Sequence, residues 1–303
     1  MKLLESLSPN LEPLPMPTIR RLSQALINKI AAGEVIERPA SVVKELMENA
    51  VDAGATRIDV SIESGGTELV RVCDNGCGIP ADELELAVTA HATSKIATAD
   101  DLFAVATLGF RGEALASIAE VSRLVLRSRT ADAAGGAEIS VHGGQGSAVA
   151  PCGCPTGTTI EVRDLFFNTP VRRKFLRSTQ TELGHVSEAF LRVVLASPHL
   201  HATLQHNGRP VFELSGEQGW LERIERVFGR EVAESLIPVE SADGPVRLSG
   251  YVAHPSQSRS NNRMQYLFLN GRCIRDRSLQ HALGEAYRGL LLTGRYPIAI
   301  LAL

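Results

Sequence analysis

The sequence predicts an α/β protein of two domains, and three features support this fold class. The chain has 303 residues, which is enough for two hydrophobic cores. Stretches in which apolar residues alternate, as in strands, lie between stretches with helical periodicity. The composition changes near Gly216, so we expect a loose extension at residues 1–18, a larger domain at 19–216 and a smaller one at 217–303.

The larger domain is expected to begin with two helices. The stretch LSQALINKIAAGEV suits a helix that is capped by Ser23 and ends at Gly33. The second helix lies in ERPASVVKELMENAVDAGA, where Pro39 fits the first turn and Gly54 fits the exit. Its spacing predicts a buried stripe that consists of Val43, Leu46, Met47 and Ala50.

A β-hairpin should follow the second helix. Apolar residues alternate from Ile58 to Ile62, Gly65 and Gly66 turn the chain, and residues 69–73 return. Residues 82–118 have a helical pattern that glycines interrupt. Further strands are predicted in SRLVLRSRT, AEISVHGG, GTTIEVRDL and HATLQHNGRPVFEL, with a helix at residues 183–195 before the last of them.

The smaller domain shows the same mixture of elements. Helices are predicted at residues 220–228 and 278–291. The segments VRLSGYVA and YLFLNGRCI are each predicted as a strand, and the apolar run PIAILAL as a third.

Composition excludes several classes of protein. No apolar run approaches the roughly 20 residues that a membrane-spanning helix needs. The first 18 residues carry two Glu and four Pro, which is unlike a signal peptide. The five cysteines are an odd number, and their spacings match no common zinc site. We therefore expect a cytoplasmic protein with reduced thiols and no membrane association.

The second helix has an unusual polar face. Glu45, Glu48, Asn49 and Asp52 fall at i, i+3, i+4 and i+7, and no Lys or Arg shares these positions. A solvated face is the common reason for such a stripe. The alternative is the wall of a site for a cation and a water molecule.

A second polar segment, CDNGCGI, comes at the end of a predicted strand. Asp74 can accept a hydrogen bond from an exocyclic amine, while Gly76 and Gly78 let a flat ring approach the backbone. Thr158, in GTTIEV, can add a hydroxyl group beside Asp74. Each segment alone is common in turns and strand starts.

Any phosphate group must be held without a Walker P-loop, because the chain contains no Gly-Lys dipeptide. The segments HATSKI and LGFRGEAL offer another way. Gly109 and Gly112 flank backbone N–H groups near a helix start, where phosphate oxygens can bind.

Taken in order, these segments resemble the MutL family of DNA mismatch-repair proteins, which belongs to the GHKL ATPases. The resemblance covers residues 19–303. The acidic helix and DNGCGI are shared with the wider superfamily, whereas GFRGEAL and NTPVRRKFL point to the MutL family itself. The implied fold is a Bergerat-type α/β sandwich that binds ATP, followed by a ribosomal-protein-S5-like α/β domain that is incomplete at its C-terminus.

The resemblance also implies roles for single residues. Glu45 matches the general base, Asn49 the Mg²⁺ ligand, and Asp74 the carboxylate that reads adenine, with Thr158 as its helper. Glu48 and Asp52 are expected to be supporting charges. The other implied ATP contacts are Gly76, Gly78, Thr93, Lys95, Gly109, Phe110, Arg111 and Gly112.

One element of the family pattern is absent from this sequence. In the family, a lysine of the second domain reaches the γ-phosphate, but this chain has no lysine after Lys174. We therefore expect a shortened chain that binds ATP and is a weak Mg²⁺-dependent ATPase. The resemblance further implies that residues 78–109 close as a lid and that two copies associate when ATP binds.

The implied function is an ATP-gated clamp that couples mismatch recognition, by a MutS-type protein, to downstream repair enzymes at the bacterial nucleoid. The alternative is a non-catalytic, nucleotide-gated DNA-binding module that has lost hydrolysis through C-terminal truncation. A topoisomerase subunit and a histidine kinase are less well supported. The sequence shows no nucleophilic tyrosine motif and no phospho-acceptor helix before the site.

The smaller domain carries the basic charge of the chain. Residues 255–295 contain seven Arg against one Asp and one Glu, a net of +5. Arg272, Arg275 and Arg277 lie on a predicted turn, where they are expected to project to solvent and bind DNA weakly and without sequence preference. The alternative is that they pair with the acidic larger domain.

Overall fold

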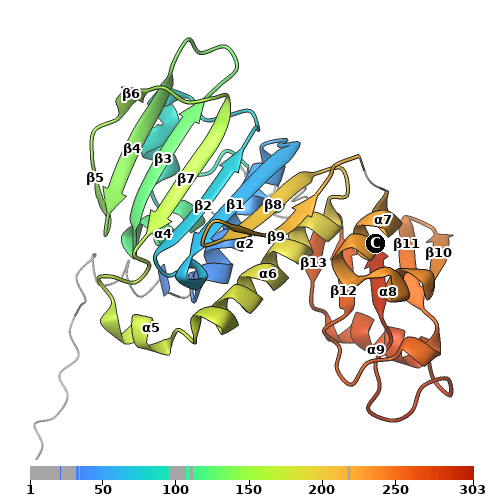
Figure 1. Cartoon of the computed structure of the whole chain (residues 1–303). Helices are drawn as coiled ribbons and strands as arrows, with labels where there is room; N and C mark the ends of the chain where they lie inside the picture. Colours follow the sequence, from blue (N-terminus) through green and yellow to red (C-terminus); the bar gives the residue numbers. More distant parts are fainter. Residues whose placement is uncertain (1–20, 22–31, 34, 96–106, 110–111, 218) are drawn as a thin grey trace, which may run out of the picture.

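The computed structural model describes residues 21, 32–33, 35–95, 107–109, 112–217 and 219–303. In this part of the chain the strands form two separate sheets, one from residues 57–214 and one from residues 236–302. The long helix α6 (Thr179–Ala196) runs from the first sheet toward the second (Figure 1). The predicted α/β fold class is therefore confirmed.

The first sheet has nine strands in the described chain, in the order β5-β4-β3-β7-β2-β1-β8-β9, with β6 paired to β4. The pair β1–β8 is parallel and the other pairs are antiparallel. The predicted hairpin is β1–β2, joined by a turn at Ser64–Gly66. The bounds are β1 Arg57–Glu63, β2 Leu69–Asp74, β3 Arg123–Arg129, β4 Gly136–His142, β5 Gln145–Gly146, β6 Ala150–Cys152, β7 Gly157–Arg163, β8 His201–His206 and β9 Arg209–Leu214.

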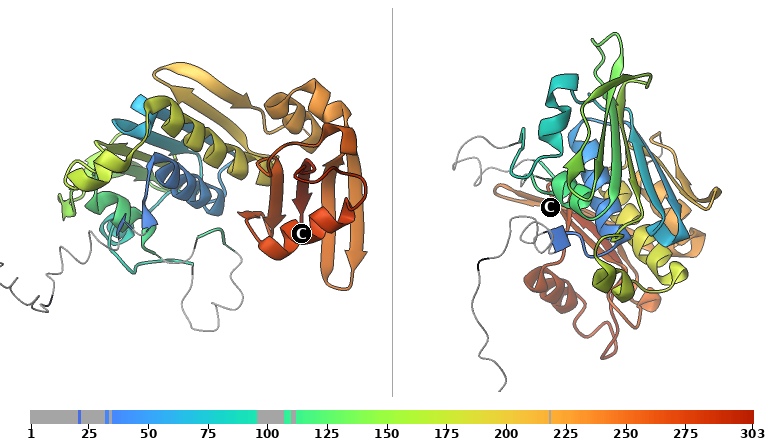
Figure 2. Two further views of the ribbon diagram at one scale, coloured as in Figure 1. Left: turned by 90° about the horizontal axis from the view of Figure 1, so that it is seen from below. Right: turned by 90° about the vertical axis from the view of Figure 1, so that its left-hand side faces the viewer.

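Helices cover one face of this sheet. Along β1, Ile58, Val60 and Ile62 are buried, while the residues between them stay partly exposed, which is the pattern of a sheet covered on one side. Figure 2 shows α2 and α6 packed side by side across that face. The bounds of the helices are α2 Pro39–Asp52, α3 Leu84–Ala87, α4 Ala114–Glu120, α5 Pro170–Phe175 and, as above, α6.

Helix α2 is the element that presents the acidic stripe. It begins with Pro39 in its first turn, where the missing N–H costs nothing, and it exits through Gly54, whose φ is +73°. Its predicted buried stripe is confirmed, because Val43, Leu46, Met47 and Ala50 are all buried against the sheet and α6. The acidic stripe lies on the other side of the helix, where Glu48 is itself buried.

The predicted helix before α2 falls mostly outside the described residues. Ala32, Gly33 and Val35 are helical, so this segment continues past Gly33, where the sequence predicted its end.

The second sheet has five strands in the order β10-β11-β14-β12-β13, in which only β12–β14 is parallel. Its aromatic core includes Trp220, Tyr266 and Phe268, and Leu195 of α6 packs into the same cluster. The elements of this part are α7 Trp220–Phe228, α8 Arg230–Glu234, β10 Leu236–Asp243, β11 Val246–Ala253, β12 Gln265–Leu269, β13 Arg272–Ile274, α9 Arg277–Ala286 and β14 Ala299–Ala302.

Two expectations for this part were wrong, and one strand was not predicted. The segment YLFLNGRCI is a hairpin of β12 and β13, because Asn270 and Gly271 both have positive φ and form a tight turn. Helix α9 ends at Ala286 instead of residue 291, and Gly289 then adopts a φ of +79°. The edge strand β10 was missed because its largely exposed residues lack clear apolar alternation.

A buried arginine joins the two parts. Arg223 of α7 is fully buried and donates to the carbonyl oxygens of Val194, Ser197, Leu200 and Ser215. Three of these carbonyl groups lie at or just after the C-terminal end of α6 and that of Ser215 follows β9, so the first helix of the second part is fixed to the first sheet and to α6. Within the described residues, no helix is long and apolar enough to cross a membrane.

Candidate functional site

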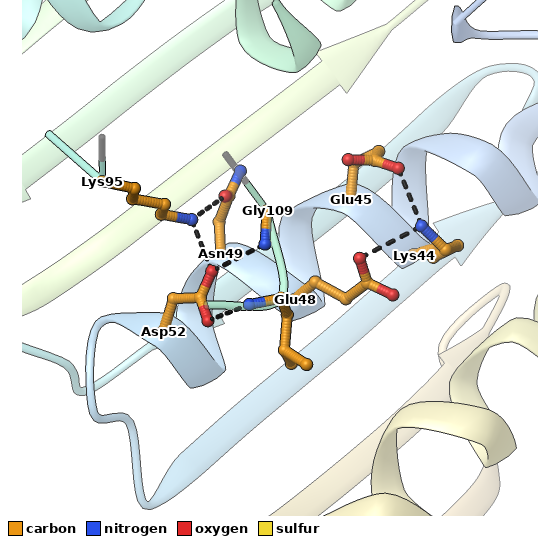
Figure 3. Close-up of polar contacts among 8 residues, drawn as sticks. Lys44, Glu45, Glu48, Asn49, Asp52, Lys95 and Gly109 are labelled. Carbon is orange, nitrogen blue, oxygen red and sulfur yellow. Dashed lines mark hydrogen bonds and ion pairs between the residues drawn. The ribbon is translucent and has the colours of Figure 1, made fainter. Parts of the chain in front are cut away.

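The acidic stripe begins with a lysine bridge at its N-terminal end. Lys44 Nζ donates to Glu45 Oε1 at 2.9 Å and to Glu48 Oε2 at 3.0 Å (Figure 3). Although no Lys or Arg occupies a stripe position, a cation from the neighbouring position therefore contacts the stripe. Lys44 precedes Glu48 by four residues, so the two side chains meet on the helix surface.

Burial and the neighbouring charges shift the pKa values of Lys44 and Glu48. Burial alone lowers the pKa of Lys44, but the carboxylates of Glu45 and Glu48 raise it above its ordinary value. Burial raises the pKa of Glu48, and the charge of Lys44 opposes this rise only in part. Glu48 is thus a buried carboxyl group bound to Lys44, whereas the Glu45 side chain keeps 27% of its surface exposed to solvent.

A second lysine lies at the C-terminal end of the stripe. Lys95 Nζ donates to Asp52 Oδ2 at 2.5 Å and to Asn49 Oδ1 at 2.9 Å. Asp52 also accepts backbone N–H groups, from Leu108 through Oδ1 at 2.8 Å and from Gly109 through Oδ2 at 3.1 Å. The structure therefore brings three distant segments together around one carboxylate, as Figure 3 shows.

Asp74 lies at the end of β2, beside the C-terminal end of α2. The connection is direct, because the N–H of Cys77 donates to the carbonyl oxygen of Ala53. Asp74 Oδ1 accepts the backbone N–H groups of Gly76 at 2.8 Å and of Thr158 at 3.3 Å. Burial raises the pKa of Asp74, although these two bonds oppose the rise.

The two oxygens of Asp74 differ in their contacts. No described residue donates a hydrogen bond to Oδ2, whereas Oδ1 has two donors. A carboxylate held in this way has one oxygen fixed by the protein and one that can accept a donor from a ligand.

The hydroxyl group of Thr158 contacts a residue that the sequence did not suggest. Its Oγ1 lies 2.9 Å from Ser128 Oγ, and the Ser128 hydroxyl also accepts the N–H of Ile79. Thr158 reaches Asp74 through its backbone N–H. Ser128 of β3 thus links β7 to the loop that follows β2, and no motif marks it because it sits within an ordinary alternating strand.

Two of the predicted site glycines are required by close packing within the protein. A Cβ atom added at Gly78, whose φ is +76°, would lie 2.3 Å from the carbonyl oxygen of Arg129. A Cβ atom at Gly112, whose φ is +63°, would lie 2.4 Å from the carbonyl oxygen of Ala92. Their roles as ATP contacts stay predictions.

The remaining predicted contacts are only partly described. Thr93 accepts the N–H of Lys95 through its hydroxyl oxygen. Phe110 and Arg111 lie outside the described residues, as do residues 96–106 of the expected lid.

The three predicted DNA-binding arginines lie in different surroundings. Arg277, at the start of α9, is exposed, but Arg272 on β13 is only partly exposed, and its charge weakly opposes the rise that burial causes in the pKa of Glu48 on α2. Arg275 is exposed and lines a cleft of about 350 Å³ between α2, α6 and β13. The arginines therefore do not all project to open solvent.

The described side chains of this region offer few ligands for a metal ion. Within the described residues, no three His, Cys, Asp or Glu side chains gather in a metal-binding cluster. Asn49 nevertheless directs its carboxamide oxygen at a cation, the ammonium group of Lys95. A single hard oxygen of this kind suits Mg²⁺, which takes most of its ligands from phosphates and water.

Two protein families match this chain. Residues 36–148 match the family described as histidine kinase-, DNA gyrase B-, and HSP90-like ATPase. Residues 224–303 match the family described as DNA mismatch repair protein, C-terminal domain. The matched ranges fall on the first and second sheets respectively.

Full-length relatives agree with these matches. The DNA mismatch repair protein MutL of Xanthomonas oryzae pv. oryzae is 52% identical over 286 residues, which are 94% of this chain and 46% of that protein. The protein of the same name from Syntrophotalea carbinolica is 50% identical over 287 residues, again 94% of this chain and 46% of that protein. The chain thus spans about half the length of the curated relatives that it matches.

Solved structures also resemble this chain in fold. The Aquifex aeolicus MutL ATPase domain complexed with ADP has a TM-score of 0.68 and 33% identity, covering 88% of this chain and 92% of that one. The N-terminal domain of a DNA repair protein has a TM-score of 0.79 at 24% identity, covering 93% of this chain and 88% of that one, and shows the fold alone. With a GHKL-type ATPase domain followed by an S5-like domain, this chain belongs to the MutL family of DNA mismatch-repair proteins.

Proposed function

We propose that this chain binds ATP between α2 and the Asp74 segment and hydrolyses it as a MutL-type repair ATPase. The observation that carries the proposal is the geometry of Asp74. One of its oxygens is fixed by two backbone N–H groups and the other has no donor among the described residues, at the sheet edge where α2 ends. The related Aquifex domain was solved with ADP, which supports an adenine nucleotide as the ligand.

Glu45 is the proposed general base. Its side chain lies on the exposed side of α2, four residues from Asn49, so both groups face the same region. Asn49 supplies the proposed Mg²⁺ contact, and the bound ion would neutralise charge on the phosphates. Lys44 keeps the Glu45 carboxylate in place before the water molecule arrives.

Replacing Glu45 tests the catalytic part of this proposal. Glu45→Ala should lower the rate of phosphate release by roughly 10²–10⁴-fold, the range for loss of a general base. The affinity for ATP should stay within a few-fold, because the adenine contact is untouched. Phosphate release and equilibrium ATP binding are measured on the same preparation.

A matched control for this variant is Glu85→Ala, which removes an exposed carboxylate from α3. It should hydrolyse ATP as the parent does. Unchanged hydrolysis per bound ATP in Glu45→Ala would remove Glu45 from the mechanism. ATP binding without phosphate release in the parent chain would favour the alternative function, a nucleotide-gated DNA-binding module.

DNA binding is proposed for the exposed part of the basic segment. Arg277 is exposed at the start of α9, and Arg275 borders the cleft beside it. Arg277→Glu should weaken binding to duplex DNA several-fold at low salt for every sequence tested, because the contact is to phosphates. ATP binding should be unchanged.

The control is Arg247→Glu, which makes the same charge change at an exposed position of β11. Equal loss of DNA affinity in both variants would mean that net charge, not the α9 surface, governs binding. DNA affinity equal to the parent in Arg277→Glu would direct attention to Arg172, Arg173 and Lys174 of α5.

The wider setting follows from the family and stays a proposal. We infer an ATP-gated clamp that associates with a second copy when ATP binds and that works with a MutS-type mismatch-recognition protein in the bacterial cytoplasm. The family membership of the chain supports this setting. Sedimentation with and without a non-hydrolysable ATP analogue tests the association of two copies.

A further inference from the structure

The inference starts from the contacts of Asp52. Both of its carboxylate oxygens are engaged, by Lys95 Nζ at 2.5 Å and by the backbone N–H groups of Leu108 at 2.8 Å and Gly109 at 3.1 Å. The side chain of Asp52 is 7% exposed and that of Lys95 is 20% exposed. The ion pair is therefore largely shielded from solvent, where charge interactions are stronger than at an open surface.

The groups around Asp52 are those that hold phosphates in proteins. Two successive backbone N–H groups and an ammonium group converge on one anion, which is the donor set of a phosphate-binding turn. Each of these donors comes from a segment far from Asp52 in the sequence. In this structure, the anion that these donors contact is the protein's own carboxylate.

The same lysine also occupies the proposed metal contact. Lys95 Nζ lies 2.9 Å from Asn49 Oδ1, so a cation of the protein already contacts the oxygen proposed for Mg²⁺. Phosphates that approach these donors meet the negative charge of Asp52. For a nucleotide to bind at these donors, its phosphates must replace Asp52 as their acceptor. The free energy of binding is then reduced by the cost of breaking the contacts of Asp52.

We propose that the Asp52 carboxylate occupies the donors that would otherwise bind phosphate, and that this internal contact lowers the affinity of the site for nucleotide. The inference rests on the proposed function, because it assumes that phosphates bind at Lys95 and Gly109. It makes Asp52 an affinity-determining residue instead of a general supporting charge. The apparent affinity of the site is reduced by the fraction of molecules in which Asp52 occupies the donors.

The test compares two neutral isosteres on one helix. Asp52→Asn removes the charge that holds Lys95, while Glu48→Gln removes a charge from the same stripe that does not contact Lys95. The two carboxylates are similarly buried, with 7% and 8% of their side chains exposed. The difference between the Mg-ATP affinities of the two variants therefore reports the contacts of Asp52, separately from the general loss of negative charge.

We expect Asp52→Asn to bind Mg-ATP roughly three- to tenfold more tightly than Glu48→Gln, as expected when a competing internal state is removed. Calorimetric titration gives both dissociation constants. Affinity of Asp52→Asn equal to or weaker than that of Glu48→Gln overturns the inference. Weaker binding would show that Asp52 supports the nucleotide-bound arrangement.

Titration with magnesium tripolyphosphate separates this inference from the proposed function, since tripolyphosphate needs no adenine contact. Tighter tripolyphosphate binding by Asp52→Asn supports the inference even where the parent fails to bind ATP. Circular dichroism confirms folding, and Asp52→Ser replaces Asp52→Asn where the latter does not fold. Failure of both variants to fold overturns the proposal, because the contact is then a requirement of the fold.

Discussion

Asp52 and Asp74 are two partly buried aspartates that each accept two backbone N–H groups, yet their surroundings differ. Asp74 uses one oxygen for both N–H groups, from Gly76 and Thr158. Asp52 uses both oxygens and has Lys95 as a counterion. Among the described residues, one carboxylate thus has an oxygen without a donor, whereas both oxygens of the other have donors.

The two aspartates differ in whether a cation lies beside the carboxylate. Burial without a cation raises the pKa of Asp74, so the protein keeps this acceptor at a cost in stability. Asp52 gains an ion pair at close range, and its charge serves to hold two loops against α2. Recognition of a ligand requires an incompletely satisfied group, whereas assembly of a site requires a satisfied one.

The same substitution at the two positions should have opposite effects on nucleotide binding, and the effect at Asp74 should be the larger. Asp74→Asn can keep both N–H bonds through its carboxamide oxygen, but it presents an NH₂ donor where the ligand needs an acceptor. Affinity for ATP should fall by about 10–100-fold, the loss expected for a hydrogen bond to a charged group. Titration with ATP and with tripolyphosphate measures it.

Tripolyphosphate is the control within this experiment, since its affinity should not change in Asp74→Asn. Asp52→Asn, which is expected to bind ATP more tightly, provides the matched substitution. ATP affinity equal to the parent in Asp74→Asn would mean that the adenine site lies elsewhere and that the two aspartates do not differ in the way proposed.

The contrast also explains which parts of the site could be predicted from the sequence. Asp74 was predicted because DNGCGI is a local motif, and α2 was predicted from Pro39, Gly54 and the spacing of its buried stripe. The bridge from Lys44 to Glu48 was within reach, because the i,i+4 spacing of opposite charges is visible in the sequence. The pattern of acidic positions does not include Lys44, because this residue lies one position before Glu45.

The contacts of Asp52 were not predictable in the same way. Lys95 and Gly109 are 43 and 57 residues away from it, and no periodicity relates them to α2. The surroundings of Arg272 depend similarly on how β13 packs beside α2 and α6, since its charge acts on Glu48. Tertiary packing of separate segments decides such contacts, and a single sequence records local pattern only.

The smallest expected effect is on stability, and it again separates the two aspartates. Burial raises the pKa of Asp74 in the folded protein above its ordinary value of 3.8, so the folded protein binds this proton more tightly than the unfolded chain does. The stability therefore falls as the pH rises through the interval between the two pKa values, and the penalty is fully present above it. Asp74→Asn removes the penalty and should raise Tm at pH 7 by about 1–3 °C.

Thermal unfolding without nucleotide, followed from pH 7 toward pH 4, measures the difference in Tm between Asp74→Asn and the parent. It should close as the pH falls, because Asp74 of the parent becomes protonated and then carries no penalty either. Asp52→Asn should instead lower Tm at pH 7, because it leaves the largely buried ammonium group of Lys95 without its carboxylate. Two outcomes would contradict this expectation: a higher Tm for both substitutions, or a difference in Tm between Asp74→Asn and the parent that grows toward acidic pH. Either outcome would show that the ion pair with Lys95 does not make the two carboxylates differ in their effect on stability.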